Sequence, residues 1–300
     1  MTTLRTDIAI VGAGPAGISA ALTCHSLSIP FTMLEQHNKI GGRIGDIGSI
    51  TNFAGFTGNG SRLAELLSTQ LAENDIRTTP GRVTSLTCGD QVKIATEPQN
   101  DSGLSLECDF VVWAAGQRPL TIFDVCGAAP VVETELTSAF YDAIVHSDRP
   151  VVVVGADRPL GTLLRSITSV KLPLHVLAFP HEAYKLREIE TDPRIHIERC
   201  QRLLGAGAGK LNYETMSGVH RALDIDSHMV VTNLGSRPNT EPLVDITNLD
   251  QFGFPVVTIA RHHAVVGDAR SARGQRISTA IGSGAEAVLR WYYDRERSTA

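Results

Sequence analysis

The first forty residues carry a hydrophobic pattern that predicts a strand, a tight turn, a helix and a second strand. A short apolar run at 8–11 is followed by glycines, and an alanine- and leucine-rich stretch then leads to a second apolar segment at 31–35. Short apolar runs bounded by glycine or proline are typical of buried strands. The order of these segments predicts a βαβ unit.

The same pattern returns in the middle of the chain. A shift of 143 positions (154 − 11 = 143) places segment 154–156 on segment 11–13, and Pro173 on Pro30, without a gap. An internal match at a fixed distance indicates a repeated structural unit. Residues 150–178 are therefore predicted to form a second copy of the βαβ unit.

Between the two copies, polar and apolar positions alternate. The segments QVKIAT and LSLECDFVVW lie between residues 85 and 113, with the polar turn PQNDSG between them. Alternation of this kind predicts a β-meander with one buried face. Near the C-terminus we expect a helix over residues 284–290.

The first predicted turn has the G-x-G-x-x-G spacing of a dinucleotide-binding site. In such a turn Gly12 makes the sharp bend, Gly14 lets backbone amides approach a pyrophosphate, and Gly17 lets the helix pack closely on the strand. The N-terminus of the helix then faces the phosphates with its partial positive charge. Glu35 ends the next strand about 20 residues on, where a carboxylate can bind ribose hydroxyls.

Composition and charge exclude several functions. The chain has 300 residues, of which 42% are hydrophobic and 20% are charged, and this is enough for two globular domains. A net charge of −5 favours neither nucleic acid nor an anionic membrane as a partner. The apolar runs are shorter than the roughly 18 residues of a membrane-spanning helix. Residues 1–6 leave no room for a signal peptide before the first strand, so we expect a cytoplasmic protein.

The five cysteines are scattered along the chain. They form no CxxC pair and have no metal-ligand spacing, so we expect buried thiols and no metal site. They are Cys24, Cys88, Cys108, Cys126 and Cys200.

Landmarks beyond the first turn indicate which dinucleotide binds. Gly41-Gly42-Arg43 follows the second strand, and the later segments are TNFAGF (51–56), VVWAAGQRP (111–119) and VVGDARSARGQRISTAIGSGAEA (265–287). This set resembles the low-molecular-weight thioredoxin reductase family of FAD flavoproteins over nearly the whole chain. The resemblance implies an α/β fold with two Rossmann-like dinucleotide-binding domains of the three-layer ββα type.

The resemblance also implies where FAD binds. In the family the first glycine turn holds the ADP half, an Ala-Thr-Gly strand end closes the domain, and a late Gly-Asp pair meets the flavin-side phosphate and ribityl chain. The family's strand end is matched here by Ala114-Ala115-Gly116, and its Gly-Asp pair by Gly267-Asp268. Asn52 matches an asparagine that contacts the flavin in the family. Three positions depart from the family, since Arg43 replaces a glutamine and Gln275-Arg276 reverses an Arg-Gln pair. The implied FAD contacts are Gly12, Gly14, Pro15, Ala16, Gly17, Glu35, Gln36, Gly42, Arg43, Ile47, Asn52, Val83, Ala115, Gly116, Gly267, Asp268, Gln275, Arg276 and Ile277.

The resemblance and the repeat together divide the chain into two domains. We expect an FAD-binding domain from residues 1–117 and 244–300, and a degenerate NAD(P)H-binding-like domain from residues 118–243. The segment VTNLGSRPNTEPL (231–243) resembles the family's Gly-x-x-Pro-Asn-Thr segment and marks the return to the first domain. The resemblance implies a homodimer.

The second copy departs from the first at positions that would contact a nucleotide. Asp157, Leu160 and Ala178 stand where the first copy has its second glycine, its third glycine and its glutamate. An acidic side chain at the second position blocks close approach of the backbone and repels two phosphates. A structural alternative is that Asp157 caps the following helix, with Pro159 at its first position.

The residues that hold the 2′-phosphate of NADPH in the family are missing as well. There, a His-Arg-Arg run and a later Arg bind this phosphate. The matching positions here are Ala178, Phe179, Pro180 and Tyr184. Lys185 and Arg187 lie nearby but lack the arranged fork that binds a phosphate. We therefore expect no NADPH binding in the family's manner.

The family's redox motif, Cys-x-x-Cys-Asp, has lost both cysteines. Its second cysteine stands 14 residues before the first glycine of the second turn, a count that leads from Gly155 to Tyr141 (155 − 14 = 141). The motif positions therefore read SAFYD, residues 138–142. Serine and tyrosine form no disulfide, which excludes electron transfer from flavin to a protein disulfide at this position. Thioredoxin reduction by the family's mechanism is excluded with it.

Two interpretations of segment 138–142 remain open. If it covers the flavin, Tyr141 stacks on the ring or donates a hydrogen bond, Ser138 orients a substrate and Asp142 acts as an acid or base. Otherwise these residues pack a domain boundary. Further candidates for lining the flavin pocket, each more simply explained by packing or exposure, are Asp46, Phe53, Phe56, His262 and His263.

Three functions fit these residues. In the first, FAD exchanges electrons directly with a small-molecule substrate, oxygen or a protein partner, without NADPH and without a dithiol. The second resembles the ferredoxin–NADP reductases of the same fold, which lack the cysteine pair but have a good NADP turn and a C-terminal extension, both missing here. In the third, FAD is structural and the protein is redox-silent, with binding or regulation as its role. We favour the first, an FAD-dependent oxidoreductase, because every FAD landmark is retained.

Overall fold

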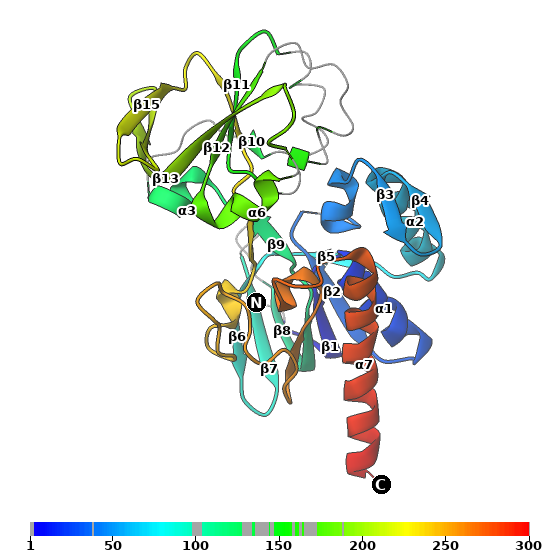
Figure 1. The fold of residues 1–300 in the computed structure, drawn as a ribbon. Helices are drawn as coiled ribbons and strands as arrows, with labels where there is room; N and C mark the ends of the chain where they lie inside the picture. The colour runs from blue at the N-terminus through cyan, green and yellow to red at the C-terminus, as the bar shows by residue number, and fades with distance from the viewer. Residues whose placement is uncertain are drawn as a thin grey trace. The chain divides into compact units, whose positions relative to one another are not determined.

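The chain forms two compact units in this computed structural model (Figure 1). One unit contains Met1–Arg118 and Arg237–Ala300, and the other contains Pro119–Ser236. The structure describes residues 3–37, 39–97, 104–127, 134–135, 144, 147–157, 160–161, 164, 173–187 and 189–299.

A mixed sheet forms the centre of the first unit. Its strand order is β5-β2-β1-β8-β7-β6, and β18 also pairs with β8. Strands β5, β2, β1, β8 and β18 pair in parallel, whereas β8, β7 and β6 follow one another as an antiparallel meander. The bounds are β1 (Thr3–Val11), β2 (Phe31–Glu35), β5 (Thr78–Pro80), β6 (Val83–Cys88), β7 (Val92–Thr96), β8 (Ser105–Trp113) and β18 (His263–Val265).

Apolar side chains alternate between the two faces of this sheet and form two cores. On one face Ile8, Ile10 and Phe110 pack against helices α1 and α7, which lie side by side (Figure 1). On the other face Val11 and Trp113 pack with apolar residues of β6 and β7. These layers confirm the predicted α/β class with a meander opposite the helices. The helices of this unit are α1 (Pro15–Ser26), α2 (Gly60–Glu73) and α7 (Ile277–Thr299).

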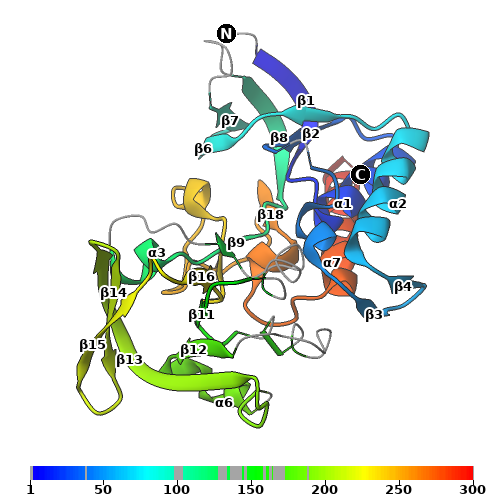
Figure 2. The same ribbon diagram turned by 90° about the horizontal axis from the view of Figure 1, so that it is seen from above.

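The second unit repeats this plan. Its strand order is β10-β16-β11-β12-β13-β14-β15, and the last two strands return antiparallel from the long β13, as Figure 2 shows. Val154 pairs with Leu177 as Val11 pairs with Leu34, each shifted by 143 positions (154 − 11 and 177 − 34). The bounds are β10 (Thr134–Glu135), β11 (Val151–Val154), β12 (Leu174–Ala178), β13 (Ile195–Gly207), β14 (Lys210–Thr215), β15 (His220–Asp224) and β16 (Met229–Thr232).

Short elements complete the two units. Strand β3 pairs with β4, and β9 pairs with β17 where the chain passes from one unit to the other. These strands are β3 (Ile50–Phe53), β4 (Phe56–Gly58), β9 (Gln117–Pro119) and β17 (Ser236–Pro238). The short helices are η1 (Gly42–Asp46), α3 (Ile122–Cys126), η3 (Pro180–Glu182), α6 (Ala183–Leu186), η4 (Glu241–Leu243) and η5 (Gly267–Arg270).

All five cysteines lie in the described part of the chain and are free thiols, but the expectation that they are buried is wrong for Cys88, which is exposed, and for Cys126, which is half-buried. Burial raises the pKa of Cys24, Cys108 and Cys200 to about 12 each. The described residues contain no group of three or more His, Cys, Asp or Glu side chains that could hold a metal ion. Within the same residues, the helices are either too short or too polar to span a membrane.

Candidate functional site

The first glycine turn is built by contacts that only glycine permits. Gly12 has φ = 105°, and a Cβ there would lie 2.5 Å from the Ala114 carbonyl oxygen of the neighbouring strand end. A Cβ on Gly17 would lie 1.9 Å from the Gly12 carbonyl oxygen, so α1 presses directly on the turn. The backbone N–H of Gly12 donates to the Leu34 carbonyl at 2.8 Å. Local geometry therefore explains the first and third glycines.

Gly14 faces open space. Apart from its chain neighbours, the described residues place no heavy atom within 4 Å of a Cβ built at this position. Gly14 is the N-terminal cap of α1, and Pro15 occupies the first helical position. The first backbone N–H groups of a helix have no partner within it. Bare backbone at a helix N-terminus is the arrangement that binds a phosphate group.

The Glu35 carboxylate closes the turn from the end of β2. Oε2 accepts a hydrogen bond from the Ala13 N–H at 2.8 Å, and Oε1 accepts one from the His37 N–H at 2.9 Å. The residue is 9% exposed. Glu35 is therefore fixed beside the turn, at the position where a carboxylate binds the ribose of a dinucleotide.

The glycine pair Gly41-Gly42 lies directly beside the first glycine turn. Gly41 and Gly42 have φ = 90° and 55°, and a Cβ on Gly42 would lie 3.3 Å from the Gly14 Cα. The Gly41 N–H donates to the Ala13 carbonyl at 2.8 Å. This pair brings η1, with Arg43, next to the first turn. Two predicted FAD contacts come after Arg43 in the sequence. Ile47 is 37% exposed, and Asn52 lies exposed on β3.

The C-terminal landmarks lie against the same turn. A Cβ on Gly267 (φ = 64°) would lie 3.0 Å from the Ala16 Cβ, and the Gly267 N–H donates to Ser283 Oγ at 2.9 Å. Burial raises the pKa of the Asp268 carboxyl, and the positive charges of Arg43 and Arg276 oppose this shift. Arg43 and Arg276, two of the residues that depart from the family, therefore lie near enough to Asp268 for their charges to act on its carboxyl group.

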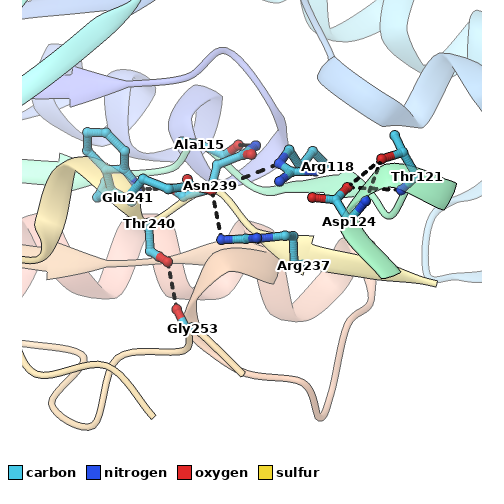
Figure 3. A network of polar contacts seen from close by, with 10 residues as sticks. Ala115, Arg118, Thr121, Asp124, Arg237, Asn239, Thr240, Glu241 and Gly253 are labelled. Carbon is cyan, nitrogen blue, oxygen red and sulfur yellow. Dashed lines mark hydrogen bonds and ion pairs between the residues drawn. The ribbon is translucent and has the colours of Figure 1, made fainter. Parts of the chain in front are cut away.

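The strand end after β8 is held by the returning chain. Asn239 Nδ2 donates to the Ala115 carbonyl at 2.8 Å, and the Asn239 carbonyl accepts from Trp113 Nε1 at 2.7 Å. Figure 3 shows this contact together with the hydrogen bond from Thr240 Oγ1 to the Gly253 carbonyl at 2.6 Å. These bonds fix the segment that leads into Gly116, whose φ is 63°. The Pro-Asn-Thr segment therefore positions part of the site.

Two contributors were missed in the sequence. Gly284 lets α7 meet α1, because a Cβ there would lie 2.0 Å from the Ala16 carbonyl oxygen. Ser283 accepts the hydrogen bond from Gly267 already described. The signal was a Gly-Ser-Gly run inside a helix, since an interior helical glycine is costly without a packing reason.

The remaining residues proposed for the FAD site and the flavin pocket mostly pack against, or pair with, neighbouring parts of the protein. Phe53 and Phe56 pack against a small core beside α2, and Asp46 pairs with Lys39 at 3.1 Å. His263 is 3% exposed on β18, and its Nε2 has no hydrogen-bond partner among the described residues. Val83 is buried in β6, Gln275 Nε2 donates to the Ser271 carbonyl at 3.1 Å, and Ile277 begins α7. Ser138, Tyr141 and Asp142 lie outside the described residues.

The second turn shares its first glycine and that glycine's close packing with the first turn, but it has a different side chain at the position of the second glycine. Gly155 has φ = 98°, and a Cβ there would lie 2.4 Å from the Asn233 carbonyl oxygen. Asp157, which replaces the second glycine, pairs through Oδ1 with Lys185 Nζ at 2.5 Å. Ala178 stands where the first copy has Glu35, and the carboxylate beside the second turn comes instead from Glu182, which accepts a hydrogen bond from the Ala156 N–H at 2.8 Å.

Two Rossmann-like units of one plan define a two-domain dinucleotide-binding architecture, and within the described residues the second glycine of the turn is kept in the first unit and replaced by Asp157 in the second. The chain belongs to the pyridine nucleotide-disulphide oxidoreductase family, whose sequence profile matches residues 6–157. Within this family it is a thioredoxin reductase-like protein of the FAD type.

Individual relatives agree with this assignment. Thioredoxin reductase from Mycoplasma genitalium is 26% identical over 320 aligned positions, which cover 95% of this chain and 93% of that protein. Thioredoxin reductase from Lactococcus lactis has the same fold, with a TM-score of 0.76 at 19% identity over 96% of this chain and 98% of that one. A bacillithiol disulfide reductase from Bacillus cereus has a TM-score of 0.76 at 16% identity, over 97% and 99% of the two chains.

Proposed function

We propose that this protein is an FAD-dependent oxidoreductase that uses neither a protein dithiol nor NADPH. Its flavin exchanges electrons directly with a small-molecule substrate, oxygen or a protein partner. One observation carries this proposal: the first turn is open at Gly14, whereas the matching position of the second turn holds the Asp157 carboxylate. A chain that has kept one nucleotide site and blocked the other uses the first.

The residues of the first unit fit FAD. The bare backbone from Gly14 to Gly17, at the N-terminus of α1, suits the pyrophosphate, and Glu35 suits the adenosine ribose. Gly267 lies against the first turn of α1 and Asp268 follows it in the chain, and this pair suits the flavin-side phosphate and the ribityl chain. Bound FAD supplies a ring that takes up and releases two electrons. The polypeptide binds and orients this ring, and Arg43 and Arg276 add positive charge beside Asp268.

The loss of both motif cysteines supports a function other than thioredoxin reduction. SAFYD stands at the positions of the redox motif, and no thiol there can accept electrons from flavin. The named activities of the relatives, which are disulfide reductions, therefore do not extend to this chain at that position. Ser138, Tyr141 and Asp142 stay our candidates for substrate contacts. We further propose a homodimer, as the family resemblance implies, and a location in the cytoplasm.

Anaerobic photoreduction of the purified protein tests whether the flavin is redox-active. We expect the visible flavin absorbance to bleach fully under light with a sacrificial donor, and to return within seconds to minutes when air is admitted, with peroxide as the product. Free FAD under the same conditions is the reference. Protein without flavin, or bound flavin that resists both light and dithionite, would instead support a redox-silent structural cofactor.

A further inference from the structure

Two histidines stand side by side on neighbouring strands of the second unit. His175 on β12 and His196 on β13 are register partners in a parallel pair, and the two strands run next to each other in Figure 2. The residues are 21 positions apart in the chain (196 − 175 = 21), which is not the spacing of a metal motif. Their ring centres lie 5.3 Å apart, with the ring planes tilted by 56°. The sheet therefore forms a histidine pair that the sequence alone does not show.

Both rings project from the same face of the sheet. The residues on either side of the two histidines pack together in one apolar core, and they are Leu174, Val176, Ile195 and Ile197. Successive side chains of a strand point to opposite faces, so both histidines point away from that core. Both are exposed. A metal ion can therefore reach both rings from solvent.

The separation of the rings suits a metal ion held between them. With a metal–nitrogen bond of about 2.0 Å, the centre of a coordinating imidazole lies about 3.2 Å from the metal, so two rings at a tetrahedral angle have their centres about 5.2 Å apart. The observed separation of 5.3 Å agrees with this value. Square-planar coordination would bring the ring centres to about 4.5 Å. The pair therefore fits a tetrahedral ion such as Zn²⁺.

The carboxylate nearest in the chain is already engaged. Glu198 follows His196 by two residues and accepts a hydrogen bond from the Tyr213 hydroxyl at 2.6 Å, while Arg221 Nη1 lies 3.0 Å from its other oxygen. Within the part of the chain that the structure describes, no third His, Cys, Asp or Glu completes the pair as a metal group. The two rings would supply two ligands and water the others, which makes an open site of modest affinity.

The chemistry of the pair selects among cations. Imidazole nitrogen suits Zn²⁺, Cu²⁺ and Ni²⁺, whereas Mg²⁺ and Ca²⁺ prefer oxygen ligands. Partial burial of the ring, together with the neighbouring His196 and His228, lowers the pKa of His175, and Glu198 opposes this shift. The lower pKa favours the neutral imidazole, which is the form that coordinates a metal ion.

We propose that His175 and His196 form a binding site for a divalent transition-metal ion of the zinc class on the second unit. The ion bridges β12 and β13 on the face opposite their shared core. This site goes beyond the proposed function and involves neither the flavin nor a glycine turn. Failure of the metal site therefore leaves the proposed function untouched, and the reverse also holds.

Calorimetric titration with ZnCl₂ at pH 7.5 tests the assignment. The protein is the full FAD-loaded chain without an affinity tag, treated with a chelator and desalted. We expect saturable binding with a Kd below about 100 µM in the wild type, weakened about tenfold or more in His175→Gln and in His196→Gln. Both substitutions are at exposed positions, so the variants should fold and keep their flavin.

Two matched controls separate this pair from other metal-binding side chains. His220→Gln removes an exposed histidine from β15 of the same unit, and Cys88→Ser removes an exposed thiol, so both should keep the wild-type affinity. Absence of saturable Zn²⁺ binding to the wild type up to about 1 mM would overturn the inference. So would a site that survives in either His175→Gln or His196→Gln, because two rings would then not share the ion.

Thermal unfolding gives an independent readout. An ion that binds only the folded protein raises the unfolding midpoint, and Zn²⁺ at about ten times its Kd should raise it by about 2 °C in the wild type. The chelator EDTA should reverse the shift, Mg²⁺ should not produce it, and His175→Gln should lack it. Equal shifts in the wild type and in His175→Gln would contradict a site at this pair.

Discussion

At the scale of single residues, the two units differ most at one position of the turn. Gly14 leaves the backbone bare, and Asp157 places a carboxylate at the matching position of the second unit. The two residues sit in nearly the same frame, since Gly12 and Gly155 have φ = 105° and 98°. On the proposed function, it is this side chain that separates the open first turn from the second.

Gly14→Asp copies this block into the first unit and should abolish FAD binding. A carboxylate at the helix N-terminus would replace bare backbone and repel the pyrophosphate. The flavin-to-protein ratio after desalting measures the effect. Gly89→Asp, on the turn between β6 and β7, is the matched control and should stay yellow. A yellow Gly14→Asp protein would contradict our account of both turns.

His263 should make stability depend on pH. Burial and the neighbouring His262 lower the pKa of His263 below its usual value of 6.5. The unfolded chain therefore binds this proton more readily than the folded protein does, so the contribution of the neutral ring is complete above pH 6.5 and is lost as the pH falls below it. One such proton changes the free energy of unfolding by at most about 1.4 kcal/mol per pH unit.

Denaturant titrations between pH 5 and pH 8 check this dependence, in the range where histidine titrates. The glutamine in His263→Gln cannot titrate, so the free energy of unfolding of this variant should change less with pH. His220→Gln, at an exposed position on β15, should keep the pH dependence of the wild type. If His263→Gln keeps the pH dependence of the wild type, other titrating groups cause it and the prediction is wrong.

At the scale of elements, close contact between α1 and α7 depends on small residues. A Cβ on Gly284 would lie 2.0 Å from the Ala16 carbonyl oxygen, and a Cβ on Gly17 would lie 1.9 Å from the Gly12 carbonyl oxygen. Helix α1 is therefore pressed between the first turn and α7. The position of its N-terminus, which would face the phosphates of FAD, follows from both contacts.

Two alanine substitutions in α7 separate this contact from helix propensity. Gly284→Ala should destabilise the protein by about 1–3 kcal/mol, because α7 must move away from α1. Gly282 is exposed, and the described residues leave open space where its Cβ would be. Gly282→Ala should therefore stabilise the helix by up to about 1 kcal/mol. Denaturant midpoints of both variants measure the difference. Equal effects would show that α7 does not rely on close packing at Gly284.

The sequence predicted the elements whose requirements are local and missed those set by tertiary contacts. The glycine turns and the apolar strands could be predicted, because positive φ and close approach demand glycine. Helix α7 was predicted over 284–290 and runs over Ile277–Thr299, since packing on α1 sustains a helix through two interior glycines. Glu182 could not be predicted, because its contact depends on how η3 turns back after β12.

At the scale of the whole molecule, one structural plan occurs twice with opposite outcomes. Glu35 accepts from the first turn, which is open at Gly14, and Glu182 accepts in the same way from the second turn, where Asp157 takes the place of that glycine. A duplicated unit can lose its ligand and keep its fold when internal groups satisfy the same backbone donors. On the proposed function, the electron donor reaches the flavin by a route other than the second turn.

Anaerobic stopped-flow mixing of the FAD-loaded protein with NADPH, with NADH and with dithionite tests this account most directly. We predict that dithionite bleaches the visible flavin absorbance, that air restores it, and that neither nicotinamide nucleotide reduces the flavin on a catalytic timescale of about 1 s or faster. Rapid bleaching by NADPH would contradict the account, because the second unit would then deliver electrons through a turn that carries Asp157 and Glu182.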